Sequence, residues 1–203
     1  MFLCFEGLAG GGKTTQANLL ADYLRRTQEK EVFVSAVYEG EARKRVSDFM
    51  HASGIASDQR AVMFLFQALH AAQHRGVSDA LDEGKIVIAD RWRDSFFAHH
   101  LYQGTFNGDE DLMRQIDQLA FGSLEPDVCF LIDVPAEVAY DRYVQRERRV
   151  EDKGLELMGP EYFSSVANYY RKIAHDKHWH VVDGTKDQQS VFEHITSVIK
   201  KDV

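Results

Sequence analysis

A glycine-rich segment near the start of the chain has the composition of a loop that binds phosphate groups. It reads Gly-Leu-Ala-Gly-Gly-Gly-Lys-Thr from residue 7 to residue 14 and fits the pattern G-x-x-x-x-G-K-[ST]. Four glycines in this segment would let backbone N–H groups converge on an anion at the positive end of a following helix. These glycines are Gly7, Gly10, Gly11 and Gly12. Lys13 would supply a mobile cation for the β- and γ-phosphates, and the Thr14 hydroxyl is placed to bind Mg²⁺. A glycine-rich turn without a ligand is the alternative, but the apolar run before it and the helical pattern after it favour nucleotide binding.

An acidic and a basic residue, Asp90 and Arg91, follow a second apolar run. A strand that ends at Asp90 would place its carboxylate at the C-terminal edge of a parallel sheet, where it can orient the water shell of Mg²⁺. Arg91 could then hold the phosphate of an acceptor. An Asp-Arg pair is also common at solvated strand ends that bind nothing. The functional interpretation is favoured here because a phosphate loop precedes the pair in the same chain.

These residues are set among alternating apolar runs and segments of helical period, a pattern typical of a parallel sheet covered by helices on both faces. The expected strands are Phe2–Phe5, Val32–Ala36, Ile86–Ala89, Val128–Ile132 and His180–Val182. The expected helices are Lys13–Thr27, Asp58–Glu83, Asp111–Phe121, Ala136–Arg146, Glu161–Lys177 and Gln188–Lys200. The longest of them should end at Gly84 and bury one stripe, formed by Val62, Leu65, Phe66, Leu69 and Ala72. The pattern predicts a single three-layer α/β domain over residues 1–203.

Composition narrows the class of protein. The 203 residues include 24 Lys and Arg against 32 Asp and Glu, and the net charge of −8 argues against a general nucleic-acid binder. No apolar run approaches the roughly 18 residues of a membrane span, so no membrane partner is expected. Cys4 and Cys129 both lie in apolar runs, which favours buried free thiols and a cytoplasmic location over a disulfide or a metal pair.

Several motifs in this order and spacing resemble the thymidylate kinase family. They are Phe5-Glu6-Gly7-Leu8 with the phosphate loop and Thr15-Gln16, Asp90-Arg91-Trp92-Arg93-Asp94-Ser95 followed by Tyr102-Gln103-Gly104, the block from Pro126 to Pro135, and Arg142. The resemblance covers nearly the whole chain. It implies a P-loop NTPase fold with a five-stranded parallel sheet of order 2-3-1-4-5, a short lid at about 142–160, a homodimer, and conversion of dTMP and MgATP to dTDP and ADP.

The resemblance also implies roles for individual residues. The catalytic group would be Lys13, Asp90, Arg91 and two lid arginines, Arg146 and Arg149, with Thr14 and Asp90 at Mg²⁺. Thr15, together with the Asp183-Gly184-Thr185 loop that packs on adenine, would complete the ATP site. The acceptor nucleoside monophosphate would meet Glu39, Phe66, Arg91, Ser95 and Phe96. A solvated basic helix end is the alternative for the lid arginines.

The acceptor half departs from the family's pattern. Ala9 stands where the family usually has a carboxylate, and no arginine occurs in the stretch from His70 to His74 that would contact the base. Phe96 replaces a small or polar residue. These departures leave three hypotheses: a dTMP kinase, a kinase of a different or modified nucleotide, and a non-catalytic ATP-binding regulator.

Overall fold

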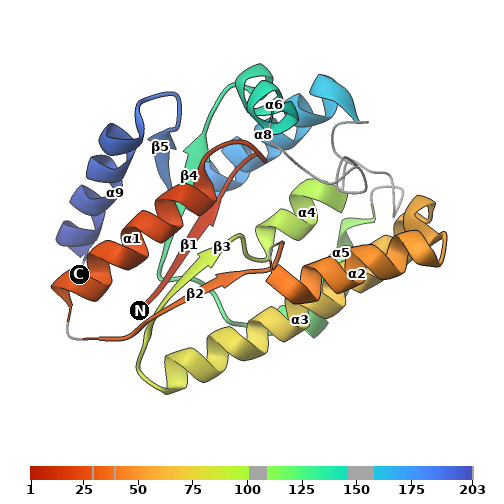
Figure 1. Cartoon of the computed structure of the whole chain (residues 1–203), viewed down its shortest axis with the longest axis horizontal. Coiled ribbons are helices and arrows are strands. Elements are labelled where there is room, and N and C mark those ends of the chain that lie inside the picture. The colour runs from red at the N-terminus through yellow and green to blue at the C-terminus, as the bar shows by residue number, and fades with distance from the viewer. Residues whose placement is uncertain (29, 39, 101–108, 146–157, 203) are drawn as a thin grey trace.

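The central sheet has five strands that all run parallel. In the computed structural model, which describes residues 1–28, 30–38, 40–100, 109–145 and 158–202, they are β1 (Phe2–Glu6), β2 (Val32–Ala36), β3 (Ile86–Asp90), β4 (Val128–Asp133) and β5 (His180–Asp183). Their order is β2-β3-β1-β4-β5 (Figure 1), which confirms the predicted topology. In an open α/β sheet of this kind, ligands bind beyond the carboxyl ends of the strands, so the ends of β1 and β3 are the place to look for the site.

Helices cover both faces of the sheet, and every predicted helix is present. They are α1 (Lys13–Thr27), α2 (Gly40–Ala52), α3 (Gln59–Asp82), α4 (Asp94–His100), α5 (Glu110–Phe121), α6 (Ala136–Val144), α8 (Gly159–Asp176) and α9 (Gln188–Asp202), with a short 3₁₀ turn at Ile55–Ser57. Helices α2 and α4 were not predicted, because α2 is rich in charged residues and α4 is only 7 residues long.

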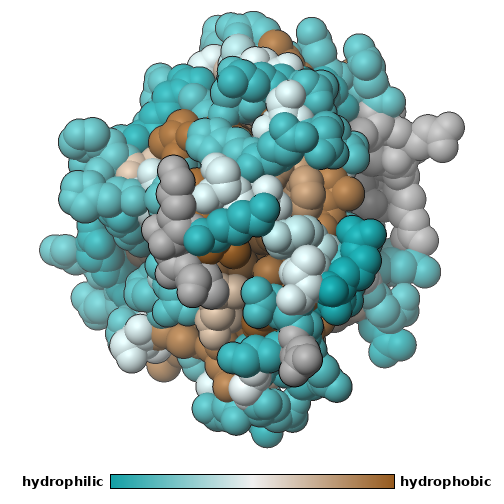
Figure 2. All heavy atoms as spheres, turned by 90° about the vertical axis from the view of Figure 1, so that its left-hand side faces the viewer, coloured by the Kyte–Doolittle hydropathy of each residue, from teal (hydrophilic) through white to brown (hydrophobic). Residues whose placement is uncertain are grey.

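The core has two halves because successive side chains of a strand point to opposite faces. Leu3 and Phe5 of β1 pack under α1 and α9, while Phe2 and Cys4 pack against α3 and α5. A further cluster joins the end of β4 to α6 and α8. Figure 2, which views the molecule from the side on which α9 lies in Figure 1, shows a mostly hydrophilic surface with apolar residues in the furrows. The structure therefore has the three layers expected.

The buried side of α3 is not the predicted one. Asp58 caps the helix by accepting from the backbone N–H groups of Arg60 and Ala61, at 3.0 and 3.2 Å. Inside lie Met63, Gln67, His70, Gln73, Val77 and Ala80. The expected stripe was wrong, since four of its members are half-buried and Ala72 is exposed. Polar residues turn inward because α3 runs past the end of the sheet, where Gln73 donates to the Arg91 carbonyl oxygen at 3.0 Å.

Cys4 and Cys129 lie opposite each other on β1 and β4, and both are buried free thiols, as expected. Over the described residues, the search for a helix both long and apolar enough to cross a membrane finds none.

Candidate active site

The loop between β1 and α1 requires glycine at several positions. Gly7, Gly10 and Gly12 have φ values of +133°, +82° and +97°, in the region that residues with a Cβ rarely adopt. A Cβ atom at Gly7 would lie 2.6 Å from the Ile132 carbonyl oxygen, and one at Gly10 would lie 2.3 Å from that of Ala139. The loop therefore packs directly against the end of β4 and against α6.

Lys13 and the first turn of α1 give this loop its positive character. Gly12 is the N-cap and makes no side-chain capping bond, and the described first turn carries no acidic residue. Backbone N–H groups at a helix N-terminus point outward with a partial positive charge. The buried Lys13 ammonium donates to the Leu8 carbonyl oxygen at 2.6 Å, which folds the side chain back over the loop. The arrangement suits a polyphosphate.

Asp90 lies beside the loop because β1 and β3 are neighbours, with Phe5 opposite Asp90. The Thr14 hydroxyl donates to Asp90 Oδ2. A hydroxyl and a carboxylate are oxygen ligands of the kind that Mg²⁺ prefers, so these residues fit the ion. Among the residues the structure describes, no group of three or more His, Cys, Asp or Glu side chains could hold a metal. Mg²⁺ bound here would take its other ligands from phosphate and water.

Arg91 is held in an unusual backbone conformation just beyond β3. Its φ is +75°, a left-handed value that costs a non-glycine residue on the order of 1 kcal/mol. Its N–H donates to the Phe5 carbonyl oxygen at 2.9 Å. Its guanidinium Nη1 donates to Ser95 Oγ at 3.0 Å and to the Tyr170 hydroxyl at 2.9 Å. Burial alone would lower the pKa of Arg91, but Tyr170 and Glu6 raise it, so the guanidinium stays charged.

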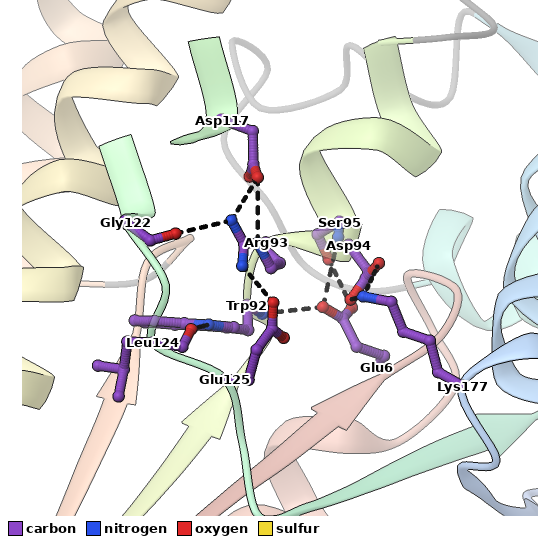
Figure 3. A network of polar contacts seen from close by, with 10 residues as sticks. All are labelled: Glu6, Trp92, Arg93, Asp94, Ser95, Asp117, Gly122, Leu124, Glu125 and Lys177. Carbon is purple, nitrogen blue, oxygen red and sulfur yellow. Dashed lines mark hydrogen bonds and ion pairs between the residues drawn. The ribbon is translucent and has the colours of Figure 1, made fainter. Parts of the chain in front are cut away.

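A buried carboxylate, Glu6, lies next to this arginine, and the sequence analysis did not place it in the site. Its Oε1 accepts from the N–H of Trp92 at 2.9 Å and of Ser95 at 3.3 Å, and its Oε2 accepts from Ser95 Oγ at 2.7 Å (Figure 3). Burial raises the pKa of Glu6 to about 7, although Arg91 opposes the shift. Two signals were available: a glutamate at the end of an otherwise apolar run, and its place in the Phe5-Glu6-Gly7-Leu8 motif.

Aromatic rings line the other side of Arg91. The guanidinium carbon lies 5.5 Å from the centre of the Tyr38 ring, which also contacts Phe66 at 5.4 Å and His70 at 5.7 Å between ring centres. The Tyr38 hydroxyl and His70 Nε2 are 3.3 Å apart. Burial lowers the pKa of His70 to about 3, so this ring is neutral at pH 7. Tyr38 was likewise not expected in the site.

The remaining acceptor residues divide into two groups. Ser95 is buried against Arg91, and the half-buried Phe66 contacts Tyr38 and Arg43. Phe96, by contrast, is completely buried and packs with Met63, Phe97 and Met113. The expectation that Phe96 faces the acceptor is therefore corrected to a core position, because this side of α4 turns toward α3 and α5. Glu39 lies outside the described residues.

Ion pairs fix the segment that carries Arg91. Arg93 donates to Asp117 Oδ2 at 2.5 and 3.1 Å, to Glu125 and to the Gly122 carbonyl oxygen at 3.1 Å (Figure 3). The Lys177 ammonium lies 2.8 Å from both oxygens of Asp94. The start of α4 is thereby joined to α5, to α8 and to the segment before β4.

The far end of the proposed ATP site is formed after β5. The Gly184 N–H donates to the Asp133 carbonyl oxygen at 2.8 Å, and Arg142 of α6 donates to the Gly184 carbonyl oxygen at 3.1 Å. Thr185 donates to Asp183 Oδ1 from its N–H at 3.0 Å and its hydroxyl at 2.6 Å. Thr15 is exposed on the first turn of α1. Arg146 and Arg149, with lid residues 146–157, lie outside the described residues.

Comparison with known proteins gives one consistent family. The family profile described as thymidylate kinase matches residues 5–195. A thymidylate kinase of Thermosipho melanesiensis is 31% identical over 201 residues, which cover 98% of this chain and 97% of that protein. The thymidylate kinases of Fervidobacterium nodosum and Kosmotoga olearia are 30% and 31% identical, covering 98% and 96% of this chain and 98% and 93% of theirs. The similarity therefore extends over donor and acceptor sides alike.

Proposed function

Because the chain belongs to the thymidylate kinase family, we propose that it transfers a phosphoryl group from ATP to a nucleoside monophosphate, with dTMP as the acceptor. The observation that carries the proposal is the contact between Thr14 and Asp90. It brings the phosphate loop beside Arg91, the residue after Asp90, so that groups suited to a donor and an acceptor phosphate lie together. In-line phosphoryl transfer requires this juxtaposition.

On the donor side, the loop N–H groups and Lys13 bind the β- and γ-phosphates, and Thr14 with Asp90 holds Mg²⁺. When bound there, the ion neutralises charge on the donor phosphates. Thr15 and the Asp183-Gly184-Thr185 loop complete the ATP site, with adenine against Gly184. The lid arginines Arg146 and Arg149 meet the γ-phosphoryl oxygens on closure, where they stabilise charge that develops in the transition state.

On the acceptor side, Arg91 binds the phosphate, Phe66 offers a stacking surface, Ser95 orients the arginine and Glu39 makes a polar contact. The wall built from Tyr38, Phe66 and neutral His70 favours a second candidate, a kinase of a modified pyrimidine nucleotide. In the described part of this wall, the polar groups are the Tyr38 hydroxyl and His70 Nε2, which lie 3.3 Å apart and can pair with each other instead of with the base, and this weakens discrimination between bases. We therefore expect dTMP phosphorylation with weak selectivity against dUMP and 5-substituted analogues.

The test is release of ADP from MgATP with each nucleoside monophosphate in turn, and a reaction without acceptor as the control. We expect dTMP to stimulate ADP release, and dUMP to stimulate it to a similar but smaller extent. Stimulation by dTMP alone at ordinary efficiency would show that other residues supply the base contacts. ATP binding without stimulation by any monophosphate would overturn the proposal in favour of an ATP-binding regulator.

A homodimer and a cytoplasmic location belong to the same proposal. The outer side of α3 carries Phe64, 61% exposed, beside the half-buried Leu65 and Leu69, and Leu119 of the adjacent α5 is 89% exposed. This face would explain why the apolar stripe of α3 points away from its own core. Sedimentation equilibrium of the wild type and Phe64→Glu tests the dimer, since a dimer through this face should dissociate in the variant.

The two free thiols, Cys4 and Cys129, support a cytoplasmic location, because thiols stay reduced in that compartment.

A further inference from the structure

Glu6 is a buried carboxylate for which the reaction proposed above has no direct use. It is 0% exposed at the end of β1, and burying a carboxylate is costly unless it is hydrogen-bonded. Among the described residues, its side-chain hydrogen bonds go to Trp92 and Ser95, in the segment that follows Asp90. We infer that Glu6 is a positioning residue, which holds the Arg91 guanidinium in the orientation that receives the acceptor phosphate. The inference rests on the proposed function for the identity of that phosphate.

The first part of the argument concerns the backbone of Arg91. Its left-handed conformation is held by three hydrogen bonds: its N–H donates to the Phe5 carbonyl oxygen at 2.9 Å, Gln73 donates to its carbonyl oxygen at 3.0 Å, and the N–H of Trp92 donates to Glu6 at 2.9 Å. Without the carboxylate, the buried Trp92 N–H would lose its acceptor and the backbone of Arg91 would lose one of these three restraints. A relaxed Arg91 backbone would swing the side chain away from its present position.

The second part concerns the side chain. When Glu6 is ionised, its carboxylate only accepts hydrogen bonds, so the Ser95 hydroxyl then donates to Glu6 Oε2. The Ser95 oxygen is then left as an acceptor for Arg91 Nη1 at 3.0 Å and for the Tyr170 hydroxyl at 2.9 Å. Among the described residues, every hydrogen bond of the guanidinium uses Nη1. Nη2 and Nε remain for a phosphate, which arginine can bind with two parallel bonds.

The charges around Glu6 agree with this role. Arg91 favours the ionised carboxylate, and Asp94 of α4 opposes it while paired with Lys177. Tyr170 of α8 faces the same group as a neutral hydroxyl, because burial raises its pKa well above the ordinary value. In its ionised form Glu6 is thus the partner charge of Arg91, joined to it through Ser95 rather than by direct contact.

The experiment is steady-state kinetics of Glu6→Gln, with the KM for dTMP and for ATP measured separately. Loss of one hydrogen bond to a charged group should raise the KM for dTMP about tenfold, with the KM for ATP unchanged. In an Arg91→Ala background, the same substitution should have no further effect on the KM for dTMP, because Glu6 acts through Arg91. A merely structural role would lower kcat in both backgrounds and leave the KM for dTMP as it was, and that result would overturn the inference.

Asp117→Asn is the matched control. Asp117 is another buried carboxylate of the same network, but it holds Arg93 and not Arg91. The Asp117→Asn substitution should lower the stability of the protein and leave the KM for dTMP unchanged.

A readout that needs no turnover is the exchange rate of the Arg91 guanidinium protons, measured by NMR. This rate should rise in Glu6→Gln, while the exchange rate of the Arg93 guanidinium protons should not. Unchanged Arg91 exchange would refute the positioning role, whereas a wild type without acceptor-stimulated turnover would refute the proposed function instead.

Discussion

Replacing Gly10 by alanine should destabilise the protein more than the same change at Gly84 or Gly12, two other glycines with positive φ. The φ of Gly10 is +82°, and a Cβ there would lie 2.3 Å from the Ala139 carbonyl oxygen of α6. Gly84 has a φ of +78° and Gly12 of +97°, and neither would bring a Cβ within 4 Å of another atom. The three substitutions share the cost of a left-handed alanine but differ in the contact with α6.

The expected loss of unfolding free energy has two contributions, the left-handed backbone and the contact with α6. A left-handed alanine costs about 1–2 kcal/mol, which is the whole effect expected at Gly84 and Gly12. At Gly10 the loop and α6 must separate by about 1 Å to restore a C···O distance of about 3.3 Å. Shifts of packed backbone of this kind cost about 1–3 kcal/mol more. Gly10→Ala should therefore lose about 2–5 kcal/mol of unfolding free energy.

Urea denaturation followed by circular dichroism measures all three variants without nucleotide. In a thermal scan, each kcal/mol should correspond to about 2–4 °C in a chain of this size. If Gly10→Ala and Gly84→Ala lose the same free energy, the packing of the loop against α6 does not contribute to stability and the reasoning fails. A smaller urea m-value for Gly10→Ala alone would show that the native or unfolded state itself had changed.

Four further substitutions test the donor site, the lid and a buried histidine. Lys13→Ala should lose at least about 2 kcal/mol of transition-state stabilisation in kcat/KM, and unchanged ATP binding and turnover would refute the donor assignment. Arg146→Ala and Arg149→Ala should lower kcat more than they raise either KM, whereas wild-type kcat in both would mean that the catalytic cation lies elsewhere. Burial lowers the pKa of His100 to about 4 from 6.5, so the unfolded state takes up the proton first and stability falls as the pH drops below 6.5. In urea titrations, His100→Gln should reduce that fall between pH 6.5 and 5 by about 2 kcal/mol; an unchanged slope, with His70 still present, would contradict the assignment.

The fold was predictable from the sequence because its signals are local. Continuous apolar runs mark strands buried on both faces, and each of the predicted strands recurs with at most one added residue. The loop motif gave the connection from β1 to α1, and the family resemblance gave the strand order. The buried side of α3 was not predictable in this way. Hydrophobic periodicity assumes that apolar side chains face the core of their own chain, and here Gln73 and His70 face inward to contact Arg91 and Tyr38.

The residues of the site also differ in whether a local sequence pattern could predict them. Lys13, Thr14, Asp90 and Arg91 belong to short motifs whose spacing fixes their geometry once the strands are placed, and the structure brings them together. Glu6 and Tyr38 act through contacts with residues more than fifty positions away. No local pattern records such a contact. Phe96 was misplaced because the sequence does not say which side of a seven-residue helix faces the site.

The acceptor side combines a buried arginine for the phosphate, Arg91, with a base surface that departs from the family's pattern. Ser95 and Tyr170 accept from the Arg91 guanidinium at 3.0 and 2.9 Å, and Ser95 in turn donates to Glu6 at 2.7 Å, so the phosphate contact does not depend on the residues that depart from the family's pattern. The departures in the acceptor half are Ala9 and the stretch from His70 to His74, which includes Ala71 and lacks an arginine, whereas Phe96 lies in the core. An enzyme that keeps its phosphate contact and loses its base contacts should lose discrimination before it loses rate, because the missing interactions are those that differ between one pyrimidine and another. The ratio of kcat/KM for dTMP and dUMP therefore reports on this surface more directly than turnover with either nucleotide alone.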